Sequence, residues 1–172
     1  MRITLAKIGN DKTVNFAVDE LYKYLKKIDF DSIVEICSFE KYNPDVENVI
    51  WVGMDESFSA EMPEVKDASL DDAILIDVSD MAGKISGNNP RAVLIAVYRF
   101  LKELGCAWVR NSSDGEIIPQ YSLTPVSMYI NEAASYRHRA ICIEGSITCE
   151  HVIDTLDWIP KAGMNGYYVQ YY

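Results

Sequence analysis

The stretch "AILIDVSDMAGKISGNNPRAVLIAVYRFLKELGCAWV", residues 73–109, carries the strongest structural signals in the sequence. Its first half predicts a β-hairpin. Residues 73–78 form one arm, Ser79 and Asp80 make the turn, and residues 81–86 form the returning arm. Two adjacent strands of this kind need an apolar cover on at least one face, and the second half of the stretch supplies it.

That second half predicts an amphipathic helix followed by a short strand. Asn89 suits the N-cap and Pro90 the first helical position, because the cap oxygen binds free backbone N–H groups and proline lacks one. Apolar residues then recur at helical spacing: Val93, Ala96, Val97, Phe100, Leu101 and Leu104. Gly105 ends the helix, and "CAWV" follows as a strand.

The preceding residues extend the same pattern. Strands are expected at residues 2–8, 32–39 and 48–54, and an edge strand at residues 123–129. Asp11 can cap a helix whose apolar stripe runs to Ile28, whereas residues 57–72 are acidic and predict a surface loop. This order predicts an α/β fold, an α+β sandwich over residues 1–130 with a mixed β-sheet and two helices packed on one face.

A second unit follows. Residues 131–136, "NEAASY", are small and polar and predict a linker, and residues 137–172 predict one βαβ unit. Thr148 would cap its helix, with Ile147 and Val152 as a hydrophobic staple. The inward face of that helix is expected to hold Val152, Ile153, Leu156 and Ile159. Its strands are expected at residues 138–145 and 167–172, and such a unit cannot bury both faces alone.

Composition narrows the classes of partner. The 172 residues are 49% apolar and 24% charged, which is typical of globular proteins. The net charge of −10 argues against a nucleic acid or an anionic membrane, because phosphate binding needs a basic surface. No apolar run is long enough to cross a bilayer and the N-terminus does not read as a signal peptide, so a cytoplasmic location is expected.

The four cysteines, Cys37, Cys106, Cys142 and Cys149, form no C-x-x-C pair, and three lie in apolar runs. They are predicted to be buried free thiols, in keeping with a reducing compartment. A zinc site built from Cys149, His151 and His138 would lack a fourth ligand, and no metal or other cofactor is expected. The glycines show no phosphate-binding spacing.

Two stretches resemble parts of known enzymes. Residues 73–109 are similar to the non-catalytic N-terminal domain of β-hexosaminidases, α-glucuronidases and α-N-acetylglucosaminidases, in which a hairpin runs into a glycine-rich helix and then "L-G-C-x-W". The matching residues are Gly87, Pro90 to Val93, Ala96, Phe100, Leu101 and Leu104 to Trp108. Ala92 and Ala96 stand where the pattern has glycine, which close packing should tolerate.

Residues 136–172 resemble the opening of the catalytic (β/α)8 barrel of the same enzymes, through Arg139, Glu144, Asp157, Trp158, Gly163 and Asn165. The resemblance implies that Arg139 binds sugar hydroxyls and that Glu144 lies in or beside the site, in a full-length parent only. A surface ion pair is the alternative. The catalytic carboxylates of these families lie on later strands, so no catalytic residue is expected here.

Other candidate residues have structural alternatives. Trp51, Trp108 and Trp158 could form a sugar-stacking platform, but each fits a core position better. Asp71 with Asp72, and Asp154 with Asp157, could form acid–base pairs, but solvated positions are expected for both.

These features predict the N-terminal part of a carbohydrate-active enzyme, a glycoside hydrolase. An accessory domain would brace a barrel that acts on a carbohydrate, and this part alone would be inactive. The sequence stops inside an expected strand, which predicts a reading frame that continues past Tyr172. The alternative is a stand-alone binding or interaction module whose terminal βαβ unit mediates self-association, as a homodimer for example. The sequence leaves open the sugar, the linkage and the stereochemical course.

Overall fold

The computed structural model describes residues 1–59, 61–144 and 148–170, and for residues 144, 169 and 170 it describes the backbone alone. Three features of the expected βαβ unit lie outside the described residues. They are the Ile147 half of the hydrophobic staple, the last residue of the strand expected at 138–145, and Tyr171 and Tyr172. Within the described part, no helix is both long enough and apolar enough to span a bilayer.

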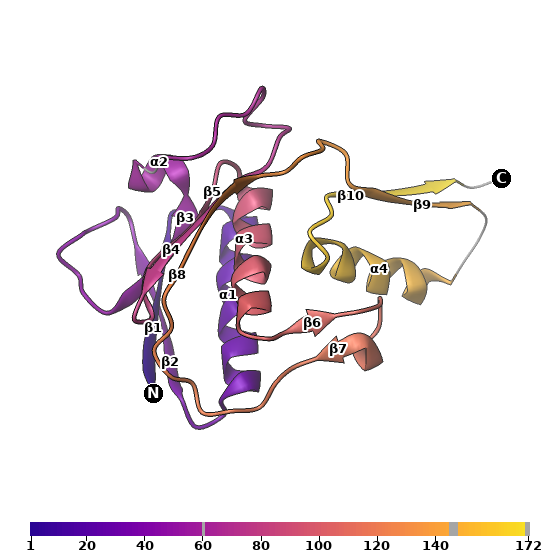
Figure 1. Ribbon diagram of the computed structural model, residues 1–172. Helices are drawn as coiled ribbons and strands as arrows, with labels where there is room; N and C mark the ends of the chain where they lie inside the picture. The colour runs from indigo at the N-terminus through magenta and orange to yellow at the C-terminus, as the bar shows by residue number, and fades with distance from the viewer. Residues whose placement is uncertain (60, 145–147, 171–172) are drawn as a thin grey trace.

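The first unit is built on a six-stranded mixed sheet in the order β2-β1-β3-β5-β4-β8 (Figure 1). The strands are β1 (Arg2–Ile8), β2 (Ile33–Phe39), β3 (Val49–Met54), β4 (Ala73–Ser79), β5 (Ala82–Gly87) and β8 (Met128–Ala133). Strands β2, β1, β3 and β5 are parallel, whereas β4 is antiparallel to both β5 and β8. The expected hairpin is therefore the β4–β5 pair, and the strand expected to be central, β3, lies inside the sheet.

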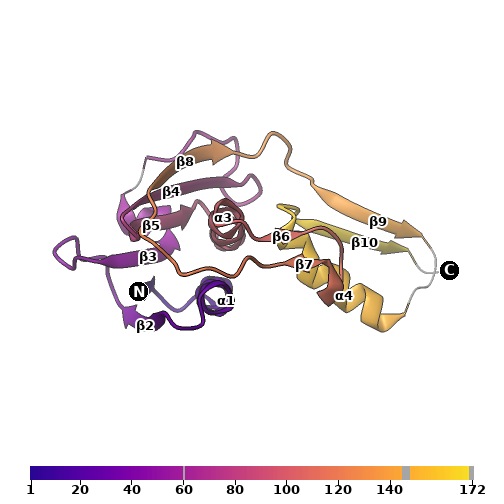
Figure 2. The same ribbon diagram turned by 60° about the horizontal axis from the view of Figure 1, so that its bottom comes forward.

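Two long helices, α1 (Lys12–Ile28) and α3 (Pro90–Glu103), lie side by side on one face of this sheet (Figure 2). Both begin at the predicted caps. Asp11 Oδ1 accepts hydrogen bonds from the N–H groups of Thr13 and Val14, and Asn89 Oδ1 accepts one from Ala92. The predicted α/β fold, a mixed sheet with both helices on one face, is confirmed.

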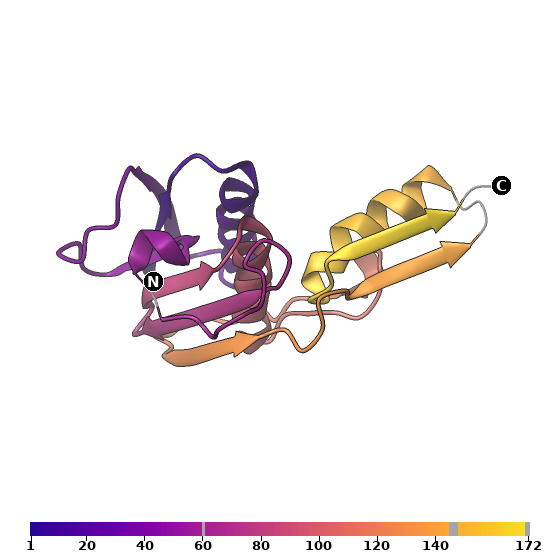
Figure 3. The same ribbon diagram turned by 90° about the horizontal axis from the view of Figure 1, so that it is seen from above.

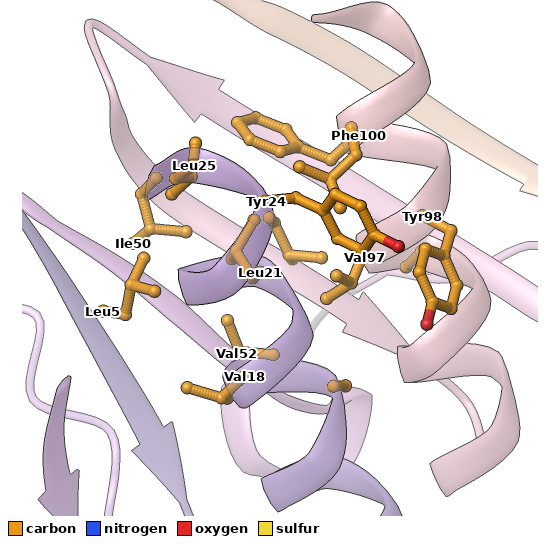
Figure 4. Close-up of a cluster of buried hydrophobic side chains, with 14 of the residues drawn as sticks. Leu5, Val18, Leu21, Tyr24, Leu25, Ile50, Val52, Val97, Tyr98 and Phe100 are labelled. Atoms are coloured by element: carbon orange, nitrogen blue, oxygen red, sulfur yellow. The ribbon is translucent and has the colours of Figure 1, made fainter. Parts of the chain in front are cut away.

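The main core fills the space between the helices and the sheet (Figure 4). Leu5, Ile50 and Val52 project from the sheet toward side chains of both helices. The helix residues labelled in that view are Val18, Leu21, Tyr24, Leu25, Val97, Tyr98 and Phe100. A smaller cluster on the opposite face, around Trp51 and Phe58, is covered by the short helix α2 (Asp55–Phe58) and by Tyr42 and Val46.

Gly87 allows the end of β5 to approach the start of α3. A Cβ at this position would lie 2.4 Å from the backbone nitrogen of Val93 and 2.7 Å from Cβ of Ala92. Ala92 lies at this contact, and both Ala92 and Ala96 are fully buried. The alanines that replace glycine in the resembled pattern are therefore accommodated, whereas Gly87 has no room for a side chain.

The last strand of the sheet differs from the prediction in position. Residues 123–127 are not a strand, because the N–H of Leu123 donates to the carboxylate of Asp29 at 2.9 Å and not to a neighbouring strand. Strand β8 instead runs to Ala133, so residues 131–133, expected in the linker, pair with β4. Between α3 and β8 lie a short antiparallel pair, β6 (Ala107–Trp108) and β7 (Glu116–Ile117), and the 3-10 turn η1 (Ser113–Gly115).

The second unit is the predicted βαβ arrangement, with β9 (Ala140–Glu144), α4 (Cys149–Lys161) and β10 (Gly166–Gln170). Strands β9 and β10 are parallel, and Gly166 lies opposite Ala140. Thr148 caps α4 as predicted, since its hydroxyl accepts from the N–H of His151 at 3.2 Å. Figure 3 shows this unit beside the first, joined to it through the chain that follows β8.

The predicted inward face of α4 is wrong in part. Ile153 and Leu156 are 60% and 52% exposed, and the buried residues of the helix are Thr155, Ile159 and Lys161. The helix turns Thr155 and Trp158 toward the first unit, where they meet Asn111 and Trp108. Two strands make too narrow a sheet to cover the rest of the apolar stripe.

The prediction of buried thiols is also wrong for two of the four cysteines. Cys106 is buried and Cys37 is half-buried, whereas Cys142 and Cys149 are exposed. Both exposed thiols belong to the βαβ unit, where apolar positions are not fully covered. All four cysteines are free.

Candidate functional site

Two neighbouring aspartates at the start of β4 hold the two units together. Asp71 accepts from Arg137 through two hydrogen bonds of 2.6 and 3.0 Å, a bidentate pair. Asp72 accepts from Arg91 of α3 at 2.7 Å and from Arg139 at 2.6 Å, one arginine on each carboxylate oxygen. We call these five residues the aspartate clamp. It ties the first unit to the segment that leads into β9.

Two asparagines complete the hydrogen bonding of the clamp. The amide nitrogens of Asn89 and Asn165 each donate to Asp72 at 3.2 Å. Asn165 also donates to the carbonyl of Arg137 at 2.7 Å and accepts from the N–H of Arg139 at 3.0 Å. The turn before β10 and the cap of α3 therefore meet at the same carboxylate.

The solvated position expected for Asp72 is wrong. The residue is 3% exposed, because α3 and the β9 segment close over it. Burial alone would raise the pKa of Asp72, but the hydrogen bonds from Arg91 and Arg139 outweigh it and hold the pKa below its usual value. Asp72 is therefore an ionised carboxylate with an organising role, and it is not paired with Asp71 as an acid–base couple.

The two residues implied by the family resemblance lie at opposite ends of one strand. Arg139 immediately precedes β9 and Glu144 is its last residue, about 17 Å away at the rise of an extended strand. Arg139 also donates to the carbonyls of Gly163 at 2.8 Å and Tyr136 at 2.7 Å, so each of its three nitrogens has a protein partner. Glu144 lies at the carboxyl end of β9, but its side chain is outside the described residues.

A second polar site lies between α1 and α4, and we call it the α1–α4 cleft. It has a volume of about 240 Å³. Its lining residues come from α1, from the β6–η1–β7 segment and from α4: Lys23, Lys27, Trp108, Arg110, Ser112, Ser113, Glu116, Asp154, Asp157, Trp158 and Lys161.

Glu116 organises the floor of the cleft. Its carboxylate accepts from Tyr24 Oη, from Trp108 Nε1 at 3.2 Å and from Lys27 Nζ at 2.8 Å, and Lys161 Nζ lies 3.7 Å away. Burial opposes its ionisation, but the bonds from Lys27 and Tyr24 lower the pKa of Glu116 to about 2. Burial and the same carboxylate raise the pKa of Tyr24, so the phenol stays a donor.

Lys161 is the most deeply placed charge of the cleft, at 3% exposed. Its ammonium pairs with Asp157 one helical turn earlier and faces Glu116. Neither Lys161 nor Glu116 was a candidate from the sequence. Glu116 sits in an irregular polar stretch and Lys161 at a helix end, where a charge is usually solvated, so only the tertiary structure, which brings Lys27, Tyr24 and Lys161 to Glu116, reveals them.

The remaining candidates from the sequence, the three tryptophans and the pair Asp154 and Asp157, occupy core or surface positions. Trp51 and Trp108 are buried, and Trp158 is half-buried with its Nε1 donating to the carbonyl of Trp108 at 2.8 Å. Asp154 and Asp157 are exposed on α4, as expected, at the rim of the α1–α4 cleft. Across the described ranges, no three His, Cys, Asp or Glu side chains are grouped as a metal site would require.

The comparisons with known proteins identify a fold and no family. No protein-family profile and no curated protein matches the sequence. Among solved structures, the chain is similar to BtGH115A, a family GH115 4-O-methyl-α-glucuronidase with specificity for decorated arabinogalactans. The TM-score is 0.63 at 14% identity, over 98% of this chain and 25% of that one.

It is also similar to the glycoside hydrolase CpGH84D, with a TM-score of 0.58 at 12% identity, over 97% of this chain and 27% of that one. The chain thus spans about a quarter of the length of each of these proteins. At such low identity the likeness concerns the fold alone. The chain has a glycoside hydrolase-like α/β fold, and this likeness covers nearly all of it.

Proposed function

We propose that this chain is the N-terminal, non-catalytic part of a carbohydrate-active enzyme, a glycoside hydrolase. The six-stranded sheet unit is a hexosaminidase-like accessory domain, and the β9–α4–β10 unit begins a (β/α)8 barrel. The observation that carries the proposal is the aspartate clamp, which fixes the first barrel strand to the accessory domain through a buried carboxylate. The glycoside hydrolase-like fold supports it.

Bracing, and not chemistry, is the role that follows. A (β/α)8 barrel assembles its active site from loops at the carboxyl ends of eight strands, and β9 and β10 would supply two of them. Glycoside hydrolysis of the usual kind needs two carboxyl groups roughly 5 to 9.5 Å apart across the bond. Glu144 ends β9 at the appropriate edge, and we keep it and Arg139 as substrate-binding candidates of the parent enzyme.

Turnover is the first test. The purified chain should hydrolyse neither aryl β-hexosaminides nor aryl α-glucuronides. Clear hydrolysis that disappears in Glu144→Gln would overturn the non-catalytic role. Sequencing the gene beyond the codon for Tyr172 is the second test, since the proposal requires the reading frame to continue into further βα units.

The aspartate clamp can be tested by trypsin digestion of the native chain, because Arg137 and Arg139 are themselves cleavage sites. Asp72→Asn should free Arg139 and speed cleavage after it roughly tenfold, since a site held in structure is cut only when it opens. Asp71→Asn should instead speed cleavage after Arg137. The control Asp19→Asn changes an exposed residue of α1, away from the clamp, and should alter neither cleavage rate. Fragments identified by mass spectrometry would assign each cut. Equal rates at Arg139 in wild type and Asp72→Asn would contradict the bracing role.

One observation favours the other class of function, a stand-alone module that associates through its terminal unit. Ile153, Leu156 and Tyr168 are each more than half exposed, which is unusual for large apolar residues gathered on one small unit. That hypothesis predicts a stop codon after Tyr172 and a dimer in light scattering. Leu156→Glu should dissociate this dimer, whereas Phe30→Glu, a change at an exposed residue of the first unit, should not.

A further inference from the structure

We propose that the α1–α4 cleft binds a neutral, polyhydroxylated small molecule the size of one sugar ring. The site belongs to the chain as it stands, and it does not depend on a barrel or on the accessory role. Three properties of the cleft carry the proposal: its charge balance, its unused hydrogen-bonding capacity, and its rigid aromatic wall.

Charge balance argues for a neutral ligand. Each cation that lines the cleft already has a carboxylate partner: Lys23 with Glu20, Lys27 with Glu116, Arg110 with Asp114, and Lys161 with Asp157. An anionic ligand would have to displace one of these carboxylates, and among the lining carboxylates only Asp154, exposed at the rim, makes no ion pair with a described residue that an organic cation would have to displace. A neutral ligand can enter without breaking any pair.

The paired groups still have capacity for hydroxyl groups. An ammonium has three donor hydrogens and a carboxylate has about four acceptor sites, so one ion pair leaves most of them free. A hydroxyl group both donates and accepts, and it can therefore bridge Asp154 or Asp157 at the rim to Lys23 or Lys27 across the cleft. Ser113 adds a further hydroxyl from the η1 side, and Ser112, whose hydroxyl donates to Asp114, can still accept.

The wall and the floor are fixed in place. Trp158 lines the cleft, and its hydrogen bond to the Trp108 carbonyl holds the indole in one orientation. An indole that lines a cleft offers apolar surface to the C–H groups of a sugar ring. On the floor, Trp108 packs edge-on against Tyr24 with ring centroids 5.0 Å apart. Little side-chain ordering would then be needed on binding, which favours affinity.

The volume sets the size of the ligand. About 240 Å³ lies just below the roughly 300 to 1,000 Å³ of pockets that hold drug-sized ligands, so the cleft suits a ligand of about one ring in place of its water. A monosaccharide would displace most of this water, whereas an oligosaccharide would extend outside. A water-filled gap between two charged helices is the alternative that an experiment must exclude.

The three tryptophans make the test specific. In a ¹H–¹⁵N titration of the full chain, D-glucose or D-xylose should shift the indole signals of Trp158 and Trp108 and leave that of Trp51, on the opposite face of the sheet, unchanged. We expect saturation with a Kd on the order of 1 to 10 mM. Asp154→Asn should weaken binding at least fivefold, and the exposed control Asp19→Asn should not change it.

Each other outcome would overturn the proposal. No shift up to about 100 mM sugar would mean a hydrated gap without a ligand. Shifts with inorganic phosphate or D-glucuronate but not with D-glucose would indicate an anion site. Equal movement of all three indole signals would indicate a non-specific effect. None of these outcomes bears on the tryptic test of the aspartate clamp, so the two proposals fail separately.

Discussion

Asp72 shows how a carboxylate can be buried without loss of charge. Two arginines and two asparagines donate to its two oxygens, and these bonds replace the water that burial removes. The arrangement joins four segments of the chain: the start of β4, the start of α3, the residue before β9 and the turn before β10. The adjacent Asp71 pairs with Arg137 nearer the surface. We therefore expect Asp71 to stabilise the clamp less than Asp72 does.

Gly87 is a residue where one added methyl group should have a large effect, because it lies where β5 meets α3. Gly87→Ala places Cβ 2.4 Å from a backbone nitrogen, which cannot move without shifting α3 away from the sheet. We expect a loss of about 3 kcal/mol in the free energy of unfolding, at the upper end of the range for overpacking. Urea denaturation followed by tryptophan fluorescence measures it.

Gly53→Ala is the matched control, because Gly53 lies on the neighbouring strand and its added Cβ would come closest to the ring of Phe58, at 3.3 Å, and would otherwise make an ordinary contact with Ile8 at 3.5 Å. A side chain can yield by that amount, so the loss should be below about 1 kcal/mol. Similar losses for the two variants would show that the close approach of β5 and α3 is not a constraint.

At the scale of elements, the N-cap residues of α1 and α3 differ in the hydrogen bonds that they make outside their own helix. Asp11→Ala removes a cap at an exposed helix end and should cost about 1 kcal/mol. Asn89→Ala removes a cap and also the amide that donates to Asp72 and to the carbonyl of Asp71, and it should cost about 2 kcal/mol.

Denaturant midpoints of the two variants check this ordering. The combination Asn89→Ala with Asp72→Asn should cost less than the sum of the single changes, because both remove the same contact. Equal costs for the two caps, with strict additivity in the double variant, would contradict a link between the α3 cap and the aspartate clamp.

Helix α4 shows why an apolar stripe does not by itself say which side is covered. Its sequence predicts Ile153 and Leu156 inward, yet the helix buries Thr155 and Ile159 and packs Trp158 against the first unit. The hydroxyl of Thr155 accepts from Asn111 at 2.6 Å, and the indole of Trp158 donates to the carbonyl of Trp108. These two contacts decide which side of α4 faces the first unit.

At the scale of the whole molecule, the depressed carboxyl pKa values predict acid sensitivity. The pKa of Glu116 falls from an ordinary value of 4.5 to about 2, and that of Asp71 from 3.8 to about 2. In each case the unfolded chain binds the proton first. The stabilisation is therefore complete above about pH 5 and is lost progressively as the pH falls toward 2.

Unfolding by urea across pH 2 to 6 at constant ionic strength measures this slope. Glu116→Gln should be less stable at pH 6, because Lys161 and Lys27 lose their shared carboxylate, but its stability should fall less steeply toward pH 2. A variant slope as steep as that of the wild type would mean that Glu116 titrates alike in the folded and unfolded chains.

Much of the architecture could be predicted from local pattern. The caps at Asp11, Asn89 and Thr148 and the presence of the hairpin are visible within a few residues, because capping and turn chemistry are local. The turn itself lies one residue later than predicted, at Asp80 and Met81, because Ser79 still pairs with Ala82. The position of β8 could not be predicted. Whether Leu123 joins a strand depends on Asp29, which is 94 residues away in the sequence and binds its N–H.

The sequence by itself determined the helices α1, α3 and α4, the order of the main elements and the apolar faces of α1 and α3, since these depend on the side-chain period and on local hydrogen bonds. Tertiary structure alone decided the polar sites. The partners of Asp72 and Glu116 come from segments distant in the sequence, and a buried charge is identified only by what closes over it. For this reason Asp72, which was expected to be solvated, is the centre of the aspartate clamp, and Glu116, which was no candidate from the sequence, is the centre of the α1–α4 cleft.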